Sequence, residues 1–444
     1  MRPRQLPLWT AYMTRHACGL WIGLLCLVSA TARADLIEYV AAPDATFRWE
    51  YLGARRVDEC TVHDLHLVSQ TWQGIVWEHA MQVYVPDEVQ YPETLLLEIT
   101  GGRTGDRHDD DHVAFGVGLA AMCGAVSASL AQVPNQPLLG DRSEDDLIAH
   151  TFVEYLRTGD RTLPLLLPMT KSAVRAMDAL QEFCATHLDR EIGRFVTIGG
   201  SKRGWTSWLT AAVDTRVVAT VPLVIDTLNM PEQMDHQVEV WGEYSEQIED
   251  YTQRGLTEDM DAPDRRDLWQ MVDPVTYRDR LTVPKLSIIG TNDRYFVLDA
   301  MNLYWDDLLP PKHVLYVPNS GHGIEDRVRG LAGVAGYFRF VASETALPSP
   351  EWEFETDGAR VRLVVAAGGE ATDAQLWLAG SETADFRSAA WMSVPMLSTD
   401  SGFVGEAFLS PMRHIAVLGE LRYPIDGMAL PLSTQVRVFP PLAD

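Results

Sequence analysis

Positive charge is scarce in this sequence, and lysine is its scarcest carrier. Only four of the 36 basic residues are lysine, and 62 acidic residues outweigh them to give a formal net charge of −26 over 444 residues. Proteins that bind nucleic acid neutralise its phosphates with lysine and arginine, so this composition argues against a nucleic-acid partner. The apolar fraction of 46% is typical of a globular chain with a buried core and argues against wholesale disorder.

Cysteine is also rare. Two of the five cysteines, Cys18 and Cys26, fall in an N-terminal apolar segment. The other three, Cys60, Cys123 and Cys184, permit one disulfide and one leftover thiol in an oxidising compartment. No Cys-x-x-Cys pair or Cys/His spacing typical of zinc accompanies them. We therefore expect neither a bound metal nor a cofactor.

A long hydrophobic run is missing as well. The apolar run Ala17–Ala30 is too short for a comfortable membrane span of ~20 residues, and no later segment is long and apolar enough. Arginines precede this run and Ala32-Arg33-Ala34 follows it, which is the pattern of a cleaved export signal. We expect residues 1–34 to be a signal peptide cut after Ala34, a secreted or periplasmic protein, and no membrane span in the mature chain.

Strands and helices alternate over most of the remaining sequence. Apolar spacings of three and four residues predict helices over 145–157 and 170–187, the second capped by Thr170. Short β-branched and aromatic runs predict strands, and several are apolar throughout, as parallel strands covered on both faces are. This alternation predicts an α/β sheet. The predicted strands are 80–85, 94–99, 124–130, 194–198, 217–225, 285–289 and 313–317.

Two segments break the alternation. Residues 229–280 are acidic and aromatic and predict helices inserted between two sheet strands, either as a cap over the site or as a helical excursion that packs without moving. Beyond the turn-rich stretch near 347–350, short alternating segments predict a small all-β sandwich. We therefore expect an α/β domain over 35–346 and a β domain over 347–444.

The segment Phe195–Trp205 is the most informative for chemistry. An apolar strand runs into glycines, a serine and a helical run, which is the setting of a nucleophile elbow. The strained turn needs small neighbours, and Gly199 supplies one two residues before Ser201. The usual second glycine, two residues after the serine, is Arg203, and Gly204 follows one position later. Ser201 is therefore the candidate nucleophile.

An acid and a histidine follow the next strands in the order typical of α/β-hydrolases. Asp293 comes just past one predicted strand, and His322 comes after the next in a glycine-flanked loop. In this scheme His322 removes the proton from Ser201, while Asp293 orients the ring and stabilises its cation. Asp226, after the strand that follows the elbow, is the alternative acid, and we favour Asp293.

The remaining candidate residues surround the serine. We expect an oxyanion hole from the backbone N–H of Lys202 and that of Gly102 or Arg103, in the glycine loop after the 94–99 strand. The side chains of Lys202 and Arg203 either favour an anionic substrate or pair with acids of the cap. Arg203 and Trp241 are the candidate substrate-binding side chains.

Two rival functions stay open at this point. The run His108–His112 places two histidines and three aspartates within five residues, which would suit a divalent ion and a metal-dependent hydrolase. A solvated acidic loop explains the same run. The second rival is a secreted binding or signalling protein without turnover. Its contact surface would be formed by the tryptophan-containing insertion and the β domain. The intact Ser, Asp, His order favours a serine hydrolase over both.

Short motifs along the chain carry a resemblance to known proteins. They are Ser69-Gln70-Thr71-Trp72, Trp77-Glu78-His79, Thr100-Gly101-Gly102, Gly199–Trp205, Asp273–Tyr277, Gly290–Phe296 and Pro318–His322. Together they resemble the PhoPQ-activated pathogenicity-related protein family over nearly the whole mature chain. The resemblance implies an α/β-hydrolase-like fold and export, and it does not specify the substrate.

The elbow is also similar to the Gly-Cys-Ser-Arg-x-Gly motif of glucuronoyl esterases, with Gly200 in place of the cysteine and Lys202 in place of the arginine. This similarity implies that the displaced glycine is compatible with catalysis. The leading hypothesis is an exported serine hydrolase that cleaves an ester or amide through an acyl-enzyme on Ser201. Its substrate would be a small molecule, a saccharide ester or a peptide.

Overall fold

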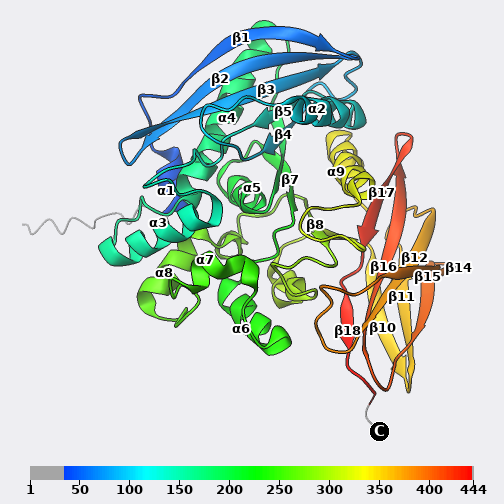
Figure 1. Ribbon diagram of the computed structural model, residues 1–444. Helices are drawn as coiled ribbons and strands as arrows, with labels where there is room; N and C mark the ends of the chain where they lie inside the picture. Colours follow the sequence, from blue (N-terminus) through cyan, green and yellow to red (C-terminus); the bar gives the residue numbers. More distant parts are fainter. Residues whose placement is uncertain (1–34, 443–444) are drawn as a thin grey trace, which may run out of the picture. The chain divides into compact units, whose positions relative to one another are not determined.

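The computed structural model describes residues 35–442, and the expected signal peptide lies outside them. Its central sheet begins with three antiparallel strands and continues with six parallel ones (Figure 1). In spatial order these strands are β1 (Arg48–Val57), β2 (Cys60–Trp72), β3 (Ile75–Pro86), β5 (Ser127–Leu130), β4 (Thr94–Ile99), β6 (Arg194–Gly200), β7 (Val217–Leu223), β8 (Lys285–Gly290) and β9 (Lys312–Val317). This order, with crossover helices between the parallel strands, is that of an α/β-hydrolase fold and confirms the expected fold class.

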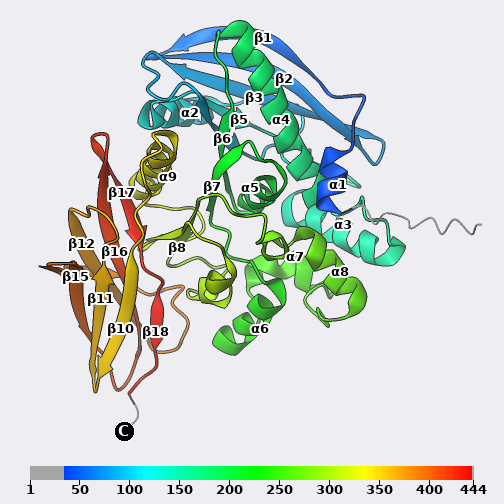
Figure 2. The same cartoon turned by 180° about the vertical axis from the view of Figure 1, so that it is seen from behind.

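Helices cover both faces of this sheet (Figures 1 and 2). One face carries α4 (Leu166–His187) and α5 (Lys202–Val213), and the other carries α2 (Asp110–Cys123) and α9 (Arg327–Ala342). The β4 strand shows why its sequence is apolar throughout: Leu95 and Leu97 join the core under α4 and α5, whereas Leu96 joins the core under α2 and α9. The helices α1 (Leu36–Ala41) and α3 (Glu144–Thr158) complete the first layer.

The structure differs from the sequence-based expectations at two places. The α4 helix begins at Leu166, four residues before the predicted N-cap, and Thr170 lies inside it with its hydroxyl donating to the Leu166 carbonyl at 2.8 Å. The assignment of Thr170 as a cap was therefore wrong. The antiparallel strands β1 and β2 were not predicted. Every residue of β1 is exposed or half-buried, so this strand gives no alternation of buried and exposed positions.

The insertion between β7 and β8 is helical, as expected. Its helices are α6 (Met230–Trp241), α7 (Glu249–Thr252) and α8 (Pro263–Val272), with short 3-10 turns at Glu246–Ile248 and Pro274–Tyr277. Two further 3-10 turns, Ala300–Leu303 and Trp305–Asp307, lie between β8 and β9. Because the insertion leaves the carboxyl end of β7 and returns to the start of β8, its first residues emerge at the edge of the sheet where Ser201 lies.

The C-terminal strands form a β sandwich that is hydrogen-bonded to the central sheet. β17 (Met428–Ser433) lies antiparallel to β9 through the Ser433–Val314 pair. The sheet then continues through β16 (His414–Ile425), β12 (Asp373–Ser381) and β13 (Met392–Pro395), with β18 (Arg437–Phe439) also paired to β16. Facing it is a second sheet of β10 (Glu351–Asp357), β11 (Arg360–Ala366), β15 (Gly402–Phe408) and β14 (Leu397–Thr399).

Two further features of the described residues concern the cysteines and the helices. Cys60, Cys123 and Cys184 are all buried free thiols, each in a different apolar cluster. Over residues 35–442, no helix is long and apolar enough to cross a membrane.

Candidate active site

Ser201 sits in a strained turn between β6 and α5. Its φ of 55° and ψ of −124° lie in a region that residues with a side chain rarely adopt. Two backbone hydrogen bonds hold the turn: Ser201 N donates to the Leu223 carbonyl at 2.8 Å, and Trp205 N donates to the Ser201 carbonyl at 3.0 Å. A strained serine at the carboxyl end of a parallel strand is the geometry of a nucleophile elbow.

Close backbone contacts explain the glycines around this serine. A Cβ on Gly199 would lie 2.5 Å from the Arg203 carbonyl oxygen, and a Cβ on Gly204 would lie 2.8 Å from the Gly199 carbonyl oxygen. The strand and the helix therefore cross between Gly199 and Gly204. The third position after Ser201, rather than the second, is where the crossing requires a glycine, and this leaves the second position free for Arg203.

The loops after β8 and β9 bring Asp293 and His322 together. His322 Nδ1 lies 2.8 Å from Asp293 Oδ2, and the carboxylate is almost completely buried. The other carboxylate oxygen accepts from the Tyr295 backbone N–H at 2.8 Å, and the Tyr295 ring lies 4.1 Å from the His322 ring, centroid to centroid. A hydrogen bond from Nδ1–H to a carboxylate leaves Nε2 as the proton acceptor. Within the described residues, this buried Nε2 has no hydrogen-bond partner.

Asp226 occupies a different environment. It is fully buried after β7 and accepts a hydrogen bond from the Tyr304 hydroxyl at 2.6 Å. Burial raises its pKa to about 7, although the Tyr304 hydrogen bond opposes the rise. His322 Nδ1 donates its hydrogen bond to Asp293, so the contacts of Asp226 give no support to the alternative assignment.

Two hydrogen bonds hold the loop that carries the candidate oxyanion donors Gly102 and Arg103. Gln132 N donates to the Gly101 carbonyl at 2.8 Å, and Arg103 N donates to Asp106 Oδ2 at 3.1 Å. Because the Arg103 N–H is already bonded, Gly102 is the better candidate of the two. Gly102 has a φ of 113°, which favours glycine at this position.

The cations beside the serine are paired with acids of α3. The Arg203 guanidinium binds both oxygens of Glu144 at 2.7 Å and the Val133 carbonyl at 2.6 Å. Lys202 Nζ lies 2.8 Å from Asp145 Oδ2. Burial tends to raise the pKa of Glu144, but the hydrogen bonds and charge of Arg203 outweigh it and lower the pKa to about 2. We therefore correct one expectation, since the paired acids lie on α3 rather than on the cap. A substrate-binding role of Arg203 stays a prediction, and the contacts that the structure shows for its side chain are with Glu144 and Val133.

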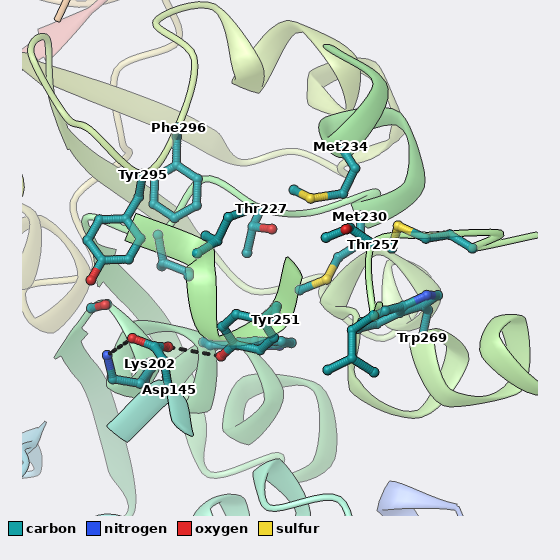
Figure 3. A pocket seen from close by; sticks show the side chains of 16 residues that line it. Asp145, Lys202, Thr227, Met230, Met234, Tyr251, Thr257, Trp269, Tyr295 and Phe296 are labelled. Atoms are coloured by element: carbon teal, nitrogen blue, oxygen red, sulfur yellow. Dashed lines mark hydrogen bonds and ion pairs between the residues drawn. The ribbon is translucent and has the colours of Figure 1, made fainter. Parts of the chain in front are cut away.

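A small cavity of about 70 Å³ opens beside Ser201 (Figure 3). Tyr295 and Phe296 line one side of it, and methionines of the insertion and Trp269 line the other. Sequence reasoning missed these methionines, because methionines at helical spacing are typical of an ordinary core. Trp241 is not part of the lining, and its ring instead lies 4.2 Å from the Arg387 guanidinium. The expectation that Trp241 contacts substrate has no support in this geometry.

The histidines of the acidic run have partners nearby. His112 Nδ1 lies 2.6 Å from Asp109, and His108 Nε2 lies 3.3 Å from the Ser129 hydroxyl. Burial lowers the pKa of His108 to about 4. In the part of the chain that the structure describes, no group of three His, Cys, Asp or Glu side chains is arranged to hold a metal ion.

The crossing of β6 and α5 predicts unequal effects of two neighbouring glycine substitutions. Gly204→Ala should lower the free energy of unfolding by about 1–3 kcal/mol or more, because the new methyl group would meet backbone atoms that cannot move aside. Gly200→Ala is the matched control, since a Cβ there has no atom within 4 Å and the change should stay within about 0.5 kcal/mol. Urea denaturation of both variants measures the difference, and equal losses would contradict the proposed crossing.

Comparisons with known proteins place this chain in a family. Solved structures of similar fold include acetyl xylan esterase 1 from Thermoanaerobacterium sp. JW/SL YS485 (14% identity, TM-score 0.47, 67% of this chain and 90% of that one) and glucuronoyl esterase from Solibacter usitatus (12%, 0.41, 69% and 88%). Autocrine proliferation repressor protein A of Dictyostelium discoideum is 33% identical over 396 residues, covering 84% of this chain and 79% of that protein. The family model for PhoPQ-activated pathogenicity-related proteins matches residues 36–387. The resemblance seen in the motifs is thus confirmed, and the chain belongs to the PhoPQ-activated pathogenicity-related protein family.

Proposed function

We propose that this protein is an exported serine hydrolase that cleaves an ester or amide through an acyl-enzyme on Ser201. The observation that carries the proposal is the hydrogen bond between Asp293 and His322, which leaves His322 Nε2 without a partner among the described residues. The strained turn of Ser201 at the end of β6 supports it. The three side chains follow three parallel strands of one sheet, where α/β sheets place their sites. Export rests on the pattern in residues 1–34.

The proposed reaction has two halves. In the first, His322 Nε2 takes the proton of the Ser201 hydroxyl as Oγ bonds to the substrate carbonyl carbon. The N–H groups of Gly102 and Lys202 stabilise the resulting oxyanion, and the protonated ring then gives its proton to the departing alcohol or amine. In the second half, water repeats these steps and releases the acid. The hydrogen bond between nucleophile and base often tightens only when substrate binds.

A second candidate function follows from the sequence relative. The name of the Dictyostelium discoideum protein describes a repressor of proliferation rather than an enzyme. This chain would then be a secreted signalling protein that keeps the hydrolase fold without turnover. Reactivity of the serine distinguishes the two functions.

We expect a fluorophosphonate probe to label the mature protein at Ser201, because an activated serine attacks phosphorus as it attacks a carbonyl carbon. Ser201→Ala should abolish labelling, and peptide mass spectrometry locates the adduct. Ser207→Ala is the control, since Ser207 is a buried serine of the same helix with its hydroxyl donating to the Arg203 carbonyl. Labelling of folded Ser201→Ala at another serine would contradict the assignment, and an unreactive wild type would favour the signalling function.

The two acids should differ in their importance for turnover. Asp293→Asn should lower kcat by up to about 10⁴-fold, as loss of a triad acid can, because the ring loses its orientation and its counter-charge. Asp226→Asn should change kcat little, since Tyr304 can donate to the amide oxygen as it does to the carboxylate. Steady-state kinetics of both variants decides the matter. A crippled Asp226→Asn beside a mild Asp293→Asn would reverse the assignment.

A further inference from the structure

The cavity beside Ser201 has an apolar wall made by the cap. Met230 and Met234 of α6, and Met260 and Trp269 of the α8 region, contribute to it, and Phe296 lines the opposite side. All five side chains are almost completely buried. Figure 3 shows the methionine side chains and Trp269 facing Tyr295 and Phe296 across this space. Methionine side chains are flexible and polarisable, so such a wall can adapt to an aliphatic chain.

Three polar side chains of the cavity, Tyr251, Asp145 and Lys202, are bonded to one another. The Tyr251 hydroxyl donates to Asp145 Oδ1 at 2.9 Å, and the other carboxylate oxygen binds Lys202 at 2.8 Å (Figure 3). A second carboxylate, that of Glu144, lies 3.3 Å from Lys202 Nζ. A negatively charged acyl group would therefore meet two carboxylates that already neutralise the lysine. The cavity suits an uncharged group.

Its size limits what the cavity can hold. At roughly 10–15 Å³ per water-sized group, about 70 Å³ leaves room for about five to seven carbon atoms. Because the cavity borders Ser201, a group that fills it would sit next to the carbonyl carbon under attack.

We propose that this cavity binds the acyl chain of the substrate, and that the preferred chain is an uncharged aliphatic group of about five to seven carbons. The proposal rests on the proposed serine hydrolase function. It assigns Met230, Met234 and Met260 to substrate selection, and it places acetyl and dicarboxylic acyl groups among the poor substrates.

Hydrolysis of p-nitrophenyl esters of increasing chain length tests the preference. Each methylene buried from water should raise kcat/KM by up to about fourfold, so hexanoate should exceed acetate by at least tenfold, and decanoate should fall below hexanoate because the cavity is full. Acetate turned over as efficiently as hexanoate would overturn the proposal, as would a preference for the anionic hemisuccinate.

A bulky substitution on α6 supplies the matched variants. Met234→Trp should fill the cavity and shift the optimum to acetate or butyrate. Val238→Trp adds the same bulk to the same helix at a side chain that is exposed and outside the cavity, and it should leave the chain-length profile unchanged. Equal shifts in both variants would overturn the cavity assignment.

Binding without turnover separates this proposal from the proposed function. In Ser201→Ala, calorimetry should detect binding of methyl hexanoate at least tenfold tighter than that of methyl acetate. An inactive wild type whose alanine variant binds methyl hexanoate in this way contradicts the hydrolase function alone. Absence of that binding difference contradicts the cavity assignment.

A second inference comes from an independent feature, the segment 382–391 between β12 and β13. Asn292 Nδ2 donates to the carbonyls of Ala389 at 2.7 Å and Phe386 at 3.2 Å. Asn319 accepts from Trp391 N at 2.8 Å and donates to the Trp391 carbonyl at 3.0 Å. Both carboxamides thus bind the backbone of one segment of the C-terminal β sandwich.

The two asparagines belong to the loops that carry Asp293 and His322. Asn292 directly precedes Asp293, and Asn319 lies three residues before His322 in the loop after β9. The Thr291 hydroxyl connects them, since it donates to Asn292 Oδ1 at 2.8 Å and accepts from Asn319 N at 3.0 Å. Any shift of the segment 382–391 therefore acts on both loops together.

We infer that Asn292 and Asn319 are positioning residues, through which the segment 382–391 holds Asp293 and His322 at hydrogen-bond distance. This inference also rests on the proposed function. Neither asparagine needs to touch substrate, so their effect should fall on the chemical step and not on substrate binding.

Asn292→Ala should lower kcat by about 10- to 100-fold with KM within about threefold, because small misplacements of reacting groups are costly. Asn302→Ala is the matched control. Asn302 also binds a C-terminal backbone carbonyl, that of Val436 at 3.1 Å, but it lies on the 3-10 turn Ala300–Leu303, later in the β8–β9 connection, and that carbonyl is outside the segment 382–391. It should leave kcat within about threefold, and an equal loss in both variants would overturn the positioning role.

A spectroscopic measurement keeps this test independent of turnover. The Nδ1–H proton of His322, bonded to Asp293, should give a downfield proton resonance that disappears in Asp293→Asn. The resonance should be lost or shifted in Asn292→Ala and kept in Asn302→Ala. Its retention in folded Asn292→Ala would contradict the positioning role even if the protein proved to have no hydrolase activity.

Discussion

The candidate site depends on the ion pairs and hydrogen bonds that the acidic first turn of α3 forms. Three consecutive carboxylates there each bind a different group. Their partners are Arg203 for Glu144, Lys202 and Tyr251 for Asp145, and Arg254 for Asp146. The amino end of a helix stabilises negative charge, which favours this clustering of acids. One turn therefore fixes the start of α5, which carries the nucleophile turn, and α7 of the cap.

The Glu144 carboxylate remains ionised over a wide pH range. Because the pKa of Glu144 falls from 4.5 to about 2, its pairing contributes stability above the unfolded value near 4.5 and loses it only as the pH falls through about 2. Carboxylates of α3 neutralise both basic side chains beside the serine, Lys202 and Arg203. These two of the chain's 36 basic residues therefore create no anion site there. The elbow, the helix pairing and the apolar cavity form one consistent arrangement.

The parts of the site that sequence predicted are those with a local signature. Ser201, Asp293 and His322 each follow an apolar strand with glycine or turn residues beside it, and the chain order restricts their places on the sheet. Contacts between distant segments left no such mark. Glu144, the partner of Arg203, is 59 residues away, and the carbonyls that bind Asn292 are more than 90 residues away. The contact of Trp241 with Arg387 left no mark for the same reason, because Arg387 lies in the distant segment 382–391.

The segment 382–391 also links the two inferences physically. Arg387 lies over the Trp241 ring at the end of α6 and forms an ion pair with Glu246 at 3.3 Å. The same α6 helix supplies Met230 and Met234 to the cavity, while the backbone around Arg387 is bonded to Asn292. An acyl chain that displaced α6 would therefore also act on the segment 382–391, which we infer holds Asp293 and His322 in place. Taken together, the two inferences predict that these shared contacts couple filling of the cavity to alignment of the histidine.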